Sequence, residues 1–149
     1  MTHLESITRK IVTLDEAKQI VAEWKTAGEK IVFTNGCFDI IHKGHVSYLA
    51  KARDLGTKLI LGLNTDESVK RLKGANRPVK ELESRALTVA SFEYIDLVIP
   101  FSEDTPQKVI STLLPDVLVK GGDYKIDIKY LKEKHGIDFD ESQYAKKGK

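Results

Sequence analysis

Two histidines stand three positions apart in the segment TNGCFDIIHKGH, which spans Thr34–His45. A short apolar run precedes this segment, and the helix-like stretch Val46–Leu55 follows it. If the helix begins near Gly44, the spacing brings His42 and His45 to one side of its first turn. The first turn of a helix also carries unpaired backbone N–H groups and the positive end of the dipole. The segment is therefore suited to bind a phosphate.

The residue types around the two histidines indicate which phosphate chemistry they would serve. Imidazoles can bind phosphate oxygens and offset the charge that grows on a leaving group during phosphoryl or nucleotidyl transfer. Asn35 and Gly36 let the backbone turn tightly and approach a ligand closely. Asp39 has two interpretations, since it could accept backbone N–H groups and hold the loop or help to place a cation. A lone histidine would be read as a core residue, but this pair favours function.

Other chemistries have less support in the same segment. His42 and His45 could begin a zinc site with Cys37 or Asp39, but no second cluster follows at zinc-like spacing. The glycine patterns of dinucleotide-binding and P-loop proteins are both absent. Nothing supports a serine or cysteine nucleophile, so Cys37 is interpreted as a small packing residue.

A basic stretch, Lys70–Arg85, is the second candidate feature. Its cations are Lys70, Arg71, Lys73, Arg77, Lys80 and Arg85, and its only acids are Glu81 and Glu83. Such a run is most often a solvated face. Because Gly74 and Pro78 interrupt the helix, the stretch instead predicts a flexible basic loop that closes over a polyphosphate.

The segment KGGDY, at Lys120–Tyr124, is the third feature. Its two glycines expose backbone groups to a ligand, and Asp123 could take up a hydroxyl or an amino group. A simple turn is the alternative interpretation.

Apolar periodicity predicts how these segments are positioned. The expected helices span Leu14–Ala27, Val46–Leu55, Asp66–Leu72, Glu81–Tyr94 and Thr105–Leu114. The expected strands span Ile31–Thr34, Lys58–Asn64, Asp96–Pro100 and Asp116–Val119. The alternation predicts an α/β fold, a single Rossmann-like domain with a parallel sheet and helices on both faces. Ligands of such sheets lie beyond the carboxyl ends of the strands, where all three features fall.

Composition sets the broader limits. The chain has 149 residues and a net charge of +2, so we expect one domain and neither nucleic acid nor a membrane as partner. The expected core covers residues 12–125, and residues 126–149 form a divergent or partly disordered tail. Cys37 is the only cysteine, and no apolar run is long enough to span a bilayer. A cytoplasmic location is predicted, and Trp24 is interpreted as a core anchor.

The segment GCFDIIHKGH resembles the first signature of the HxGH nucleotidyltransferase superfamily, which transfers a nucleotidyl group to a phosphate. The run from Ile31 to Tyr124 is more closely similar to the adenylyltransferase domains that make ADP-heptose from heptose 1-phosphate. The segments that carry this likeness are LNTDESVKRLKGANRPV, the helix bearing Glu83 and Arg85, IPFSEDTP and PDVLVKGGDY. The family's serine- and threonine-rich segment after GGDY has no counterpart here.

The resemblance implies transfer of AMP from ATP to D-glycero-beta-D-manno-heptose 1-phosphate, with Mg²⁺ bound to the triphosphate and no direct metal ligand from the protein. It also implies a homodimer. The implied catalytic residues are His42, His45 and Lys73. The implied nucleotide-binding residues are Asn35, Gly36, Cys37, Phe38, Asp39, Gly44, Arg71, Arg77, Arg85, Lys120, Gly121 and Gly122. The implied substrate-binding residues are Asn64, Asp66, Asp123 and Tyr124.

Two alternatives stay open at this point. Glycerol-3-phosphate cytidylyltransferases share the first signature and Thr65–Glu67 but differ in the other segments, so a CTP-dependent enzyme for a polyol phosphate is the second enzyme hypothesis. A nucleotide-binding module without turnover is the non-enzyme hypothesis.

Overall fold

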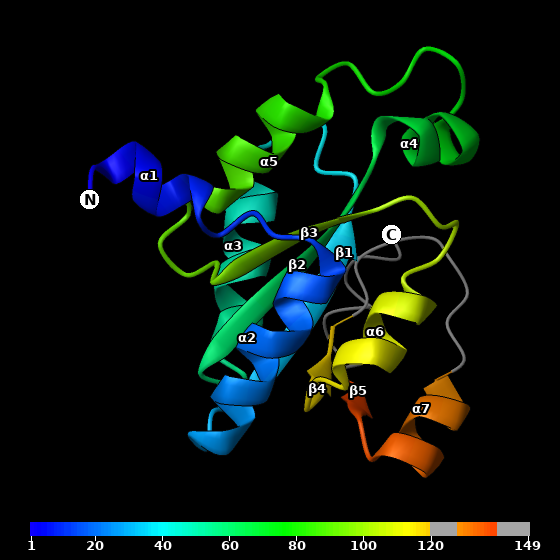
Figure 1. Cartoon of the computed structure of the whole chain (residues 1–149). Coiled ribbons are helices and arrows are strands. Elements are labelled where there is room, and N and C mark those ends of the chain that lie inside the picture. Colours follow the sequence, from blue (N-terminus) through cyan, green and yellow to red (C-terminus); the bar gives the residue numbers. More distant parts are fainter. Residues whose placement is uncertain (120–127, 140–149) are drawn as a thin grey trace.

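A five-stranded sheet forms the centre of the computed structural model, which describes residues 1–119 and 128–139 (Figure 1). The spatial order of the strands is β3-β2-β1-β4-β5, and every neighbouring pair is parallel. The strands are β1 (Ile31–Gly36), β2 (Lys58–Asn64), β3 (Leu97–Phe101), β4 (Val117–Leu118) and β5 (Asp138–Phe139). The predicted α/β class with a parallel sheet is confirmed.

Helices cover both faces of this sheet. The helices are α1 (His3–Thr8), α2 (Leu14–Thr26), α3 (Lys43–Arg53), α4 (Asp66–Lys73), α5 (Leu82–Ala90), α6 (Gln107–Leu113) and α7 (Ile128–His135). One core cluster joins α2 and α6 to Ile31 and Phe33 of β1. A second cluster joins α3 and α5 to Val32 of the same strand. Neighbouring residues of β1 therefore face opposite layers, as the alternation of side chains along a strand requires.

Burial on both faces explains why the strands read as continuous apolar runs. All six residues of β1 are buried, and so are six of the seven residues of β2. A strand with one face in water would alternate apolar and polar residues. The polar exceptions, Thr34, Asn35 and Asn64, stand near the carboxyl ends of β1 and β2.

The helix boundaries agree with the predictions in some places and depart from them in others. Thr13 and Glu16 form the predicted capping box of α2, and Trp24 packs against the core, as expected of an anchor. Helix α5 ends at Ala90, four residues before the predicted Tyr94. The sequence patterns predicted neither α1 nor, within the tail, α7 and β5.

The sheet has a switch point between β1 and β4. Residues Val32 and Phe33 of β1 pair with Val117 and Leu118, whereas all six residues of β1 pair with β2. The last residues of β1 thus extend past the described pairing with β4. In doubly wound sheets this is the position at which ligands bind. Within residues 1–119 and 128–139, no helix is long and apolar enough to cross a membrane.

Candidate active site

The two histidines close the amino-terminal end of α3. His42 is the N-cap, and its Nδ1 accepts the backbone N–H of Gly44 at 3.0 Å. The Nδ1 of His45 accepts the backbone N–H of His42 at 3.2 Å. This is a capping box in which histidines replace the usual hydroxyl residue and glutamate. The two rings lie 4.1 Å apart between centroids, so the predicted juxtaposition of the histidines is confirmed.

These bonds define the protonation geometry of both rings. A neutral imidazole that accepts at Nδ1 carries its proton at Nε2. Both histidines keep Nδ1 turned to the backbone, so the neutral form of each ring carries its proton at Nε2. The backbone itself contributes less than the sequence suggested, because the N–H groups of Gly44, His45 and Val46 are bonded to His42. Within the described chain, the N–H of Lys43 is the first-turn donor left without a partner.

Two glycines make this arrangement possible by leaving space for a ring. A Cβ on Gly44 would lie 2.7 Å from Cε1 of His42. Glycine at this position therefore leaves room for the His42 ring over the end of the helix. A Cβ on Gly36 would lie 2.6 Å from Cε2 of Phe38. Phe38 has a φ of 44°, a left-handed conformation that is rare for a bulky residue. Its buried ring lies 5.4 Å from that of His45 and supports it.

Asp39 joins the loop after β1 to the end of the basic stretch. Its Oδ2 accepts the N–H of Val79 at 2.8 Å and Nη1 of Arg77 at 3.0 Å, and its Oδ1 accepts the N–H of Lys80 at 2.8 Å. Burial alone raises the pKa of this carboxyl, but the two backbone donors and Arg77 together lower the pKa below its ordinary value. The contacts correspond to the interpretation in which Asp39 holds a loop.

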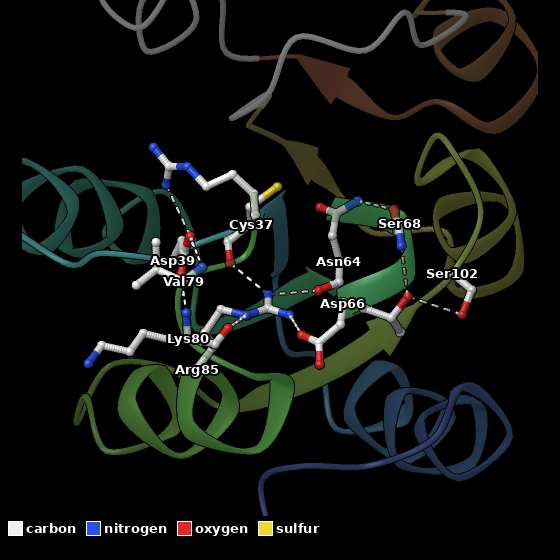
Figure 2. Close-up of polar contacts among 11 residues, drawn as sticks. Cys37, Asp39, Asn64, Asp66, Ser68, Val79, Lys80, Arg85 and Ser102 are labelled. Atoms are coloured by element: carbon white, nitrogen blue, oxygen red, sulfur yellow. Dashed lines mark hydrogen bonds and ion pairs between the residues drawn. The ribbon is translucent and has the colours of Figure 1, made fainter. Parts of the chain in front are cut away.

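Arg85 lies at the centre of a second polar cluster (Figure 2). Its side chain has no exposed surface. Its Nε donates to the carbonyl of Lys80, its Nη1 to the carbonyls of Cys37 and Asn64, and its Nη2 to Asp66 at 2.6 Å. The guanidinium thus ties together the loops after β1 and β2 and the start of α5. This burial argues against the predicted direct contact with a nucleotide and favours a positioning role.

The other cations of the basic stretch separate into bound and unbound groups. Arg71 bonds to Asp104 and Glu67 and to the carbonyl of Ser102. The hydrogen bond to Asp104 is the main reason that the pKa of Arg71 is raised above its ordinary value. The described residues provide no hydrogen bond or ion pair to the Lys73 side chain, the last residue of α4. Lys73 is therefore available to a polyphosphate, whereas Arg71 and Arg77 already have acidic partners.

The predicted substrate-binding residues of β2 and α4 have protein partners. The buried amide nitrogen of Asn64 donates to Oγ of Ser68 at 2.9 Å (Figure 2). That hydroxyl donates to the carbonyl of Glu103. Asp66 carries the ion pair with Arg85, and 41% of its side chain is exposed. Ser68 and Asp104 were not among the predicted site residues. The segments that contain them contributed to the resemblance, but nothing in their spacing indicated these bonds.

Asn35 differs from every other buried polar side chain in this region. It has no exposed surface, and within residues 1–119 and 128–139 neither its Oδ1 nor its Nδ2 has a hydrogen-bond partner. Leaving a buried polar group unpaired costs roughly 1–3 kcal/mol. Native structures retain such groups where function requires them.

Five predicted residues, Lys120, Gly121, Gly122, Asp123 and Tyr124, lie outside the described residues. Over residues 1–119 and 128–139, no three side chains of histidine, cysteine, aspartate or glutamate come together to hold a metal ion. The zinc alternative at His42, His45, Cys37 and Asp39 therefore has no ligand set in this part of the chain.

The comparisons with known proteins agree with this fold and geometry. The cytidylyltransferase-like family model matches residues 33–144, so the chain belongs to the cytidylyltransferase-like family. The predicted resemblance to HxGH nucleotidyltransferases is confirmed. A solved structure, a lipopolysaccharide core biosynthesis protein from Thermoplasma volcanium, is 28% identical with a TM-score of 0.62. The match covers 74% of this chain and 93% of that chain.

More similar sequences are found among bacterial proteins named Bifunctional protein HldE. The protein of Actinobacillus pleuropneumoniae is 56% identical over 123 residues, and that of Haemophilus ducreyi is 58% identical over the same length. Each alignment covers 83% of this chain but 26% of the relative. The chain thus spans about a quarter of the length of these relatives.

Proposed function

We propose that the chain is an adenylyltransferase that transfers AMP from ATP to a sugar phosphate, with heptose 1-phosphate as the acceptor. The paired histidines carry this proposal, because their capping box holds Nδ1 of each ring to the backbone at the start of α3, the helix that follows β1 at the switch point of the sheet. The similarity to HldE proteins and to heptose 1-phosphate adenylyltransferase domains supports ATP and a heptose as substrates.

The proposed reaction is an in-line displacement at phosphorus. An oxygen of the sugar phosphate attacks the α-phosphorus of ATP, and a new P–O bond forms as the bond to the bridging α–β oxygen breaks. Pyrophosphate leaves with the electron pair of that bond. The Nε2–H groups of His42 and His45 would donate to the oxygens that gain charge, and Lys73 would neutralise the β- and γ-phosphates. Positioning and electrostatics suffice for this step, so no nucleophile from the protein is needed.

Mg²⁺ is part of the proposal as a partner of the triphosphate. Asp39 is occupied by three donors and Asp66 by Arg85, so the described carboxylates near the histidines do not form a ready metal cluster. When bound to the triphosphate, the ion would reduce its negative charge and orient it. Homodimer formation and a cytoplasmic location remain predictions.

Release of pyrophosphate tests the proposal. The purified chain is incubated with Mg²⁺, ATP and heptose 1-phosphate, and pyrophosphate and ADP-heptose are measured. We expect both products in equal amounts. If none of a panel of sugar and polyol phosphates gives pyrophosphate, the proposal is wrong.

A cytidylyltransferase that uses CTP and glycerol 3-phosphate is the second candidate, because the matching family model is described as cytidylyltransferase-like. Calorimetric titration of ATP and CTP separates the two candidates, and a clear preference for CTP would favour the second. ATP binding without pyrophosphate release from any acceptor would indicate a binding module without turnover.

A further inference from the structure

The unpaired amide of Asn35 lies in β1, one residue before the strand ends. Side chains of β1 alternate between the two faces of the sheet, and Phe33 belongs to the core cluster of α2 and α6. Asn35 has the same parity as Phe33 and so faces this layer. Thr34 faces the opposite layer, where its hydroxyl lies 2.7 Å from that of Tyr48 on α3.

This orientation puts Asn35 on the other side of the sheet from the histidines. His42 and His45 begin α3, and α3 packs on the layer that contains Val32. Asn35 also lies past the last described pair between β1 and β4, at the switch point. On its other side it is in register with Gly62 of β2, which contributes no side chain. A molecule that crosses the carboxyl edge of the sheet from the histidines would reach the position of Asn35.

The neighbouring asparagine shows what a satisfied amide looks like in the same layer. Asn64 is buried two positions past Gly62, and its Nδ2 bonds to Ser68. Asn35 has the same residue type and the same burial, but neither of its amide atoms has a partner among the described residues. Because buried amides are almost always paired, the missing partner of Asn35 is best explained by a group that arrives with a ligand.

The chemistry of an amide indicates the kind of group that would pair with it. Oδ1 accepts and Nδ2 donates, so a single group that satisfies both atoms must itself donate and accept. A phosphate oxygen only accepts and would leave Oδ1 facing negative charge. A sugar hydroxyl donates and accepts, and the edge of a nucleobase can do the same. The acceptor sugar is favoured, since the phosphates are assigned to the opposite side of the sheet.

We propose that the Asn35 amide is a specificity-determining group that binds hydroxyls of the acceptor sugar. This inference rests on the proposed function. It adds a residue that binds the sugar part of the acceptor rather than its phosphate. A site that hydrogen-bonds a substrate hydroxyl with a buried group discriminates strongly against analogues that lack the hydroxyl, because its own groups are then left unpaired.

A kinetic experiment tests the inference with two variants and a matched control. Asn35→Leu and Asn35→Ala remove the amide, and Thr34→Val removes a buried polar group from the opposite face of the same strand. We expect the KM for heptose 1-phosphate to rise on the order of 10- to 100-fold in both Asn35 variants, with the KM for ATP changing less than about threefold. In Thr34→Val the ratio of the two KM values should stay as in the wild type.

Thermal unfolding distinguishes a residue that binds substrate from one that only stabilises the fold. Since Asn35 has no partner to lose, Asn35→Leu should unfold at the wild-type temperature or above it, whereas Thr34→Val should unfold at a lower temperature. A Tm for Asn35→Leu well below that of Thr34→Val would assign Asn35 to the fold and overturn the inference. If the Asn35 variants change only the KM for ATP, Asn35 binds the nucleotide instead, and the inference is overturned as well.

A spectroscopic titration keeps the inference separate from the proposed function. The side-chain N–H₂ resonances of Asn35 are assigned by their loss in Asn35→Leu and followed while ATP, CTP or heptose 1-phosphate is added. We expect a shift with the sugar phosphate and little change with either nucleotide. A shift with a nucleotide alone, or with none of the three, would overturn the inference even if the wild type releases pyrophosphate. A wild type that releases none would refute the proposed function, while the resonances still report the contact.

Discussion

At the scale of single residues, His42 combines two roles that are usually separate. Its Nδ1 caps α3 by accepting the N–H of Gly44, and its Nε2–H is left as a donor to a ligand. Serine, threonine, aspartate or asparagine would cap the helix equally well but would not offer the same donor. The choice of histidine at this position is therefore explained by chemistry rather than by helix stability.

Replacing His42 by asparagine separates the two roles. Asn is a good N-cap, so the free energy of unfolding of His42→Asn should stay within about 0.5 kcal/mol of the wild type. Turnover should fall on the order of 10²-fold, because a donor to the reacting phosphate is lost. His42→Ala should lose both stability and turnover. Denaturant unfolding and pyrophosphate release measure the two effects, and unchanged turnover in His42→Asn would contradict the assignment.

His45 should contribute mainly to the chemical step. His45→Ala removes an Nε2–H donor, and we expect kcat to fall on the order of 10²-fold with a much smaller change in ATP affinity. His3→Ala changes an exposed histidine of α1 and is the matched control. Single-turnover kinetics measures the step directly, and a variant with wild-type kcat would remove His45 from the mechanism.

At the scale of elements, the basic stretch is held at its second half by long-range bonds. Asp39 accepts donors from Arg77, Val79 and Lys80, and Arg85 bonds the carbonyls of Lys80 and Cys37. These partners stand about forty or more positions apart along the chain in most cases. The Gly and Pro residues predicted a break in the helix correctly, but no local pattern could indicate which carboxylate would hold the loop after it.

Arg85 illustrates the same limit of sequence reasoning. An arginine beside other cations was predicted to contact nucleotide, yet its side chain is fully buried among carbonyls and Asp66. Strands were predicted from continuous apolar runs, which burial on two faces produces, and helices from apolar residues that recur every three or four positions. The hydrogen-bond partners of the Arg85 guanidinium depend on how separate loops meet in the folded chain. No local sequence pattern indicates that arrangement.

Loss of the Arg85 side chain should destabilise the protein strongly. Arg85→Met keeps the apolar stem but leaves three carbonyls and Asp66 without their donor, so the free energy of unfolding should fall by about 3–5 kcal/mol. Arg9→Met, on the exposed end of α1, should change it by less than about 0.5 kcal/mol. Denaturant unfolding measures both, and equal small effects would contradict the role of Arg85 as the link between the loops.

The Asp39 link should make stability depend on acid. The pKa of Asp39 is lowered in the folded state, so its contribution is fully present above the ordinary aspartate pKa of about 3.9 and is lost as the pH falls through the lower folded value. Asp39→Asn should lower the free energy of unfolding by about 1–3 kcal/mol at neutral pH and flatten its decline in acid. Unfolding curves between neutral pH and about pH 3 provide the comparison. An unchanged slope would show that other carboxyls govern the acid response.

At the scale of the whole molecule, the strand order explains why the site contains groups from distant segments. The chain winds outward from β1 through β2 to β3 and then returns to β4 on the other side (Figure 1). The loops after the strands therefore converge at one edge, with the histidines on one side of β1 and Asn35 on the other. A substrate pair bound across this edge would contact both layers, which links the two proposals.

The same arrangement leads to a prediction about metal dependence. Because the described residues form no metal-binding cluster, Mg²⁺ should bind as a complex with the triphosphate and not to the empty protein. EDTA should leave the Tm of the ligand-free chain unchanged. With Mg²⁺, ATP at about 100 times its Kd should stabilise the fold by about 2.7 kcal/mol, which corresponds to a rise in Tm of about 5–10 °C for a domain of this size.

EDTA should remove most of the ATP-dependent rise in Tm. Sodium chloride at matched ionic strength should remove less of it, because salt screens charges but does not remove Mg²⁺. In His42→Asn the ATP-dependent rise should be smaller than in the wild type, since a donor to the triphosphate is missing. If EDTA instead lowers the Tm of the ligand-free chain, a metal is bound by the protein itself. The triphosphate would then enter a site already charged by that metal, and the histidines would carry less of the electrostatic stabilisation than their geometry implies.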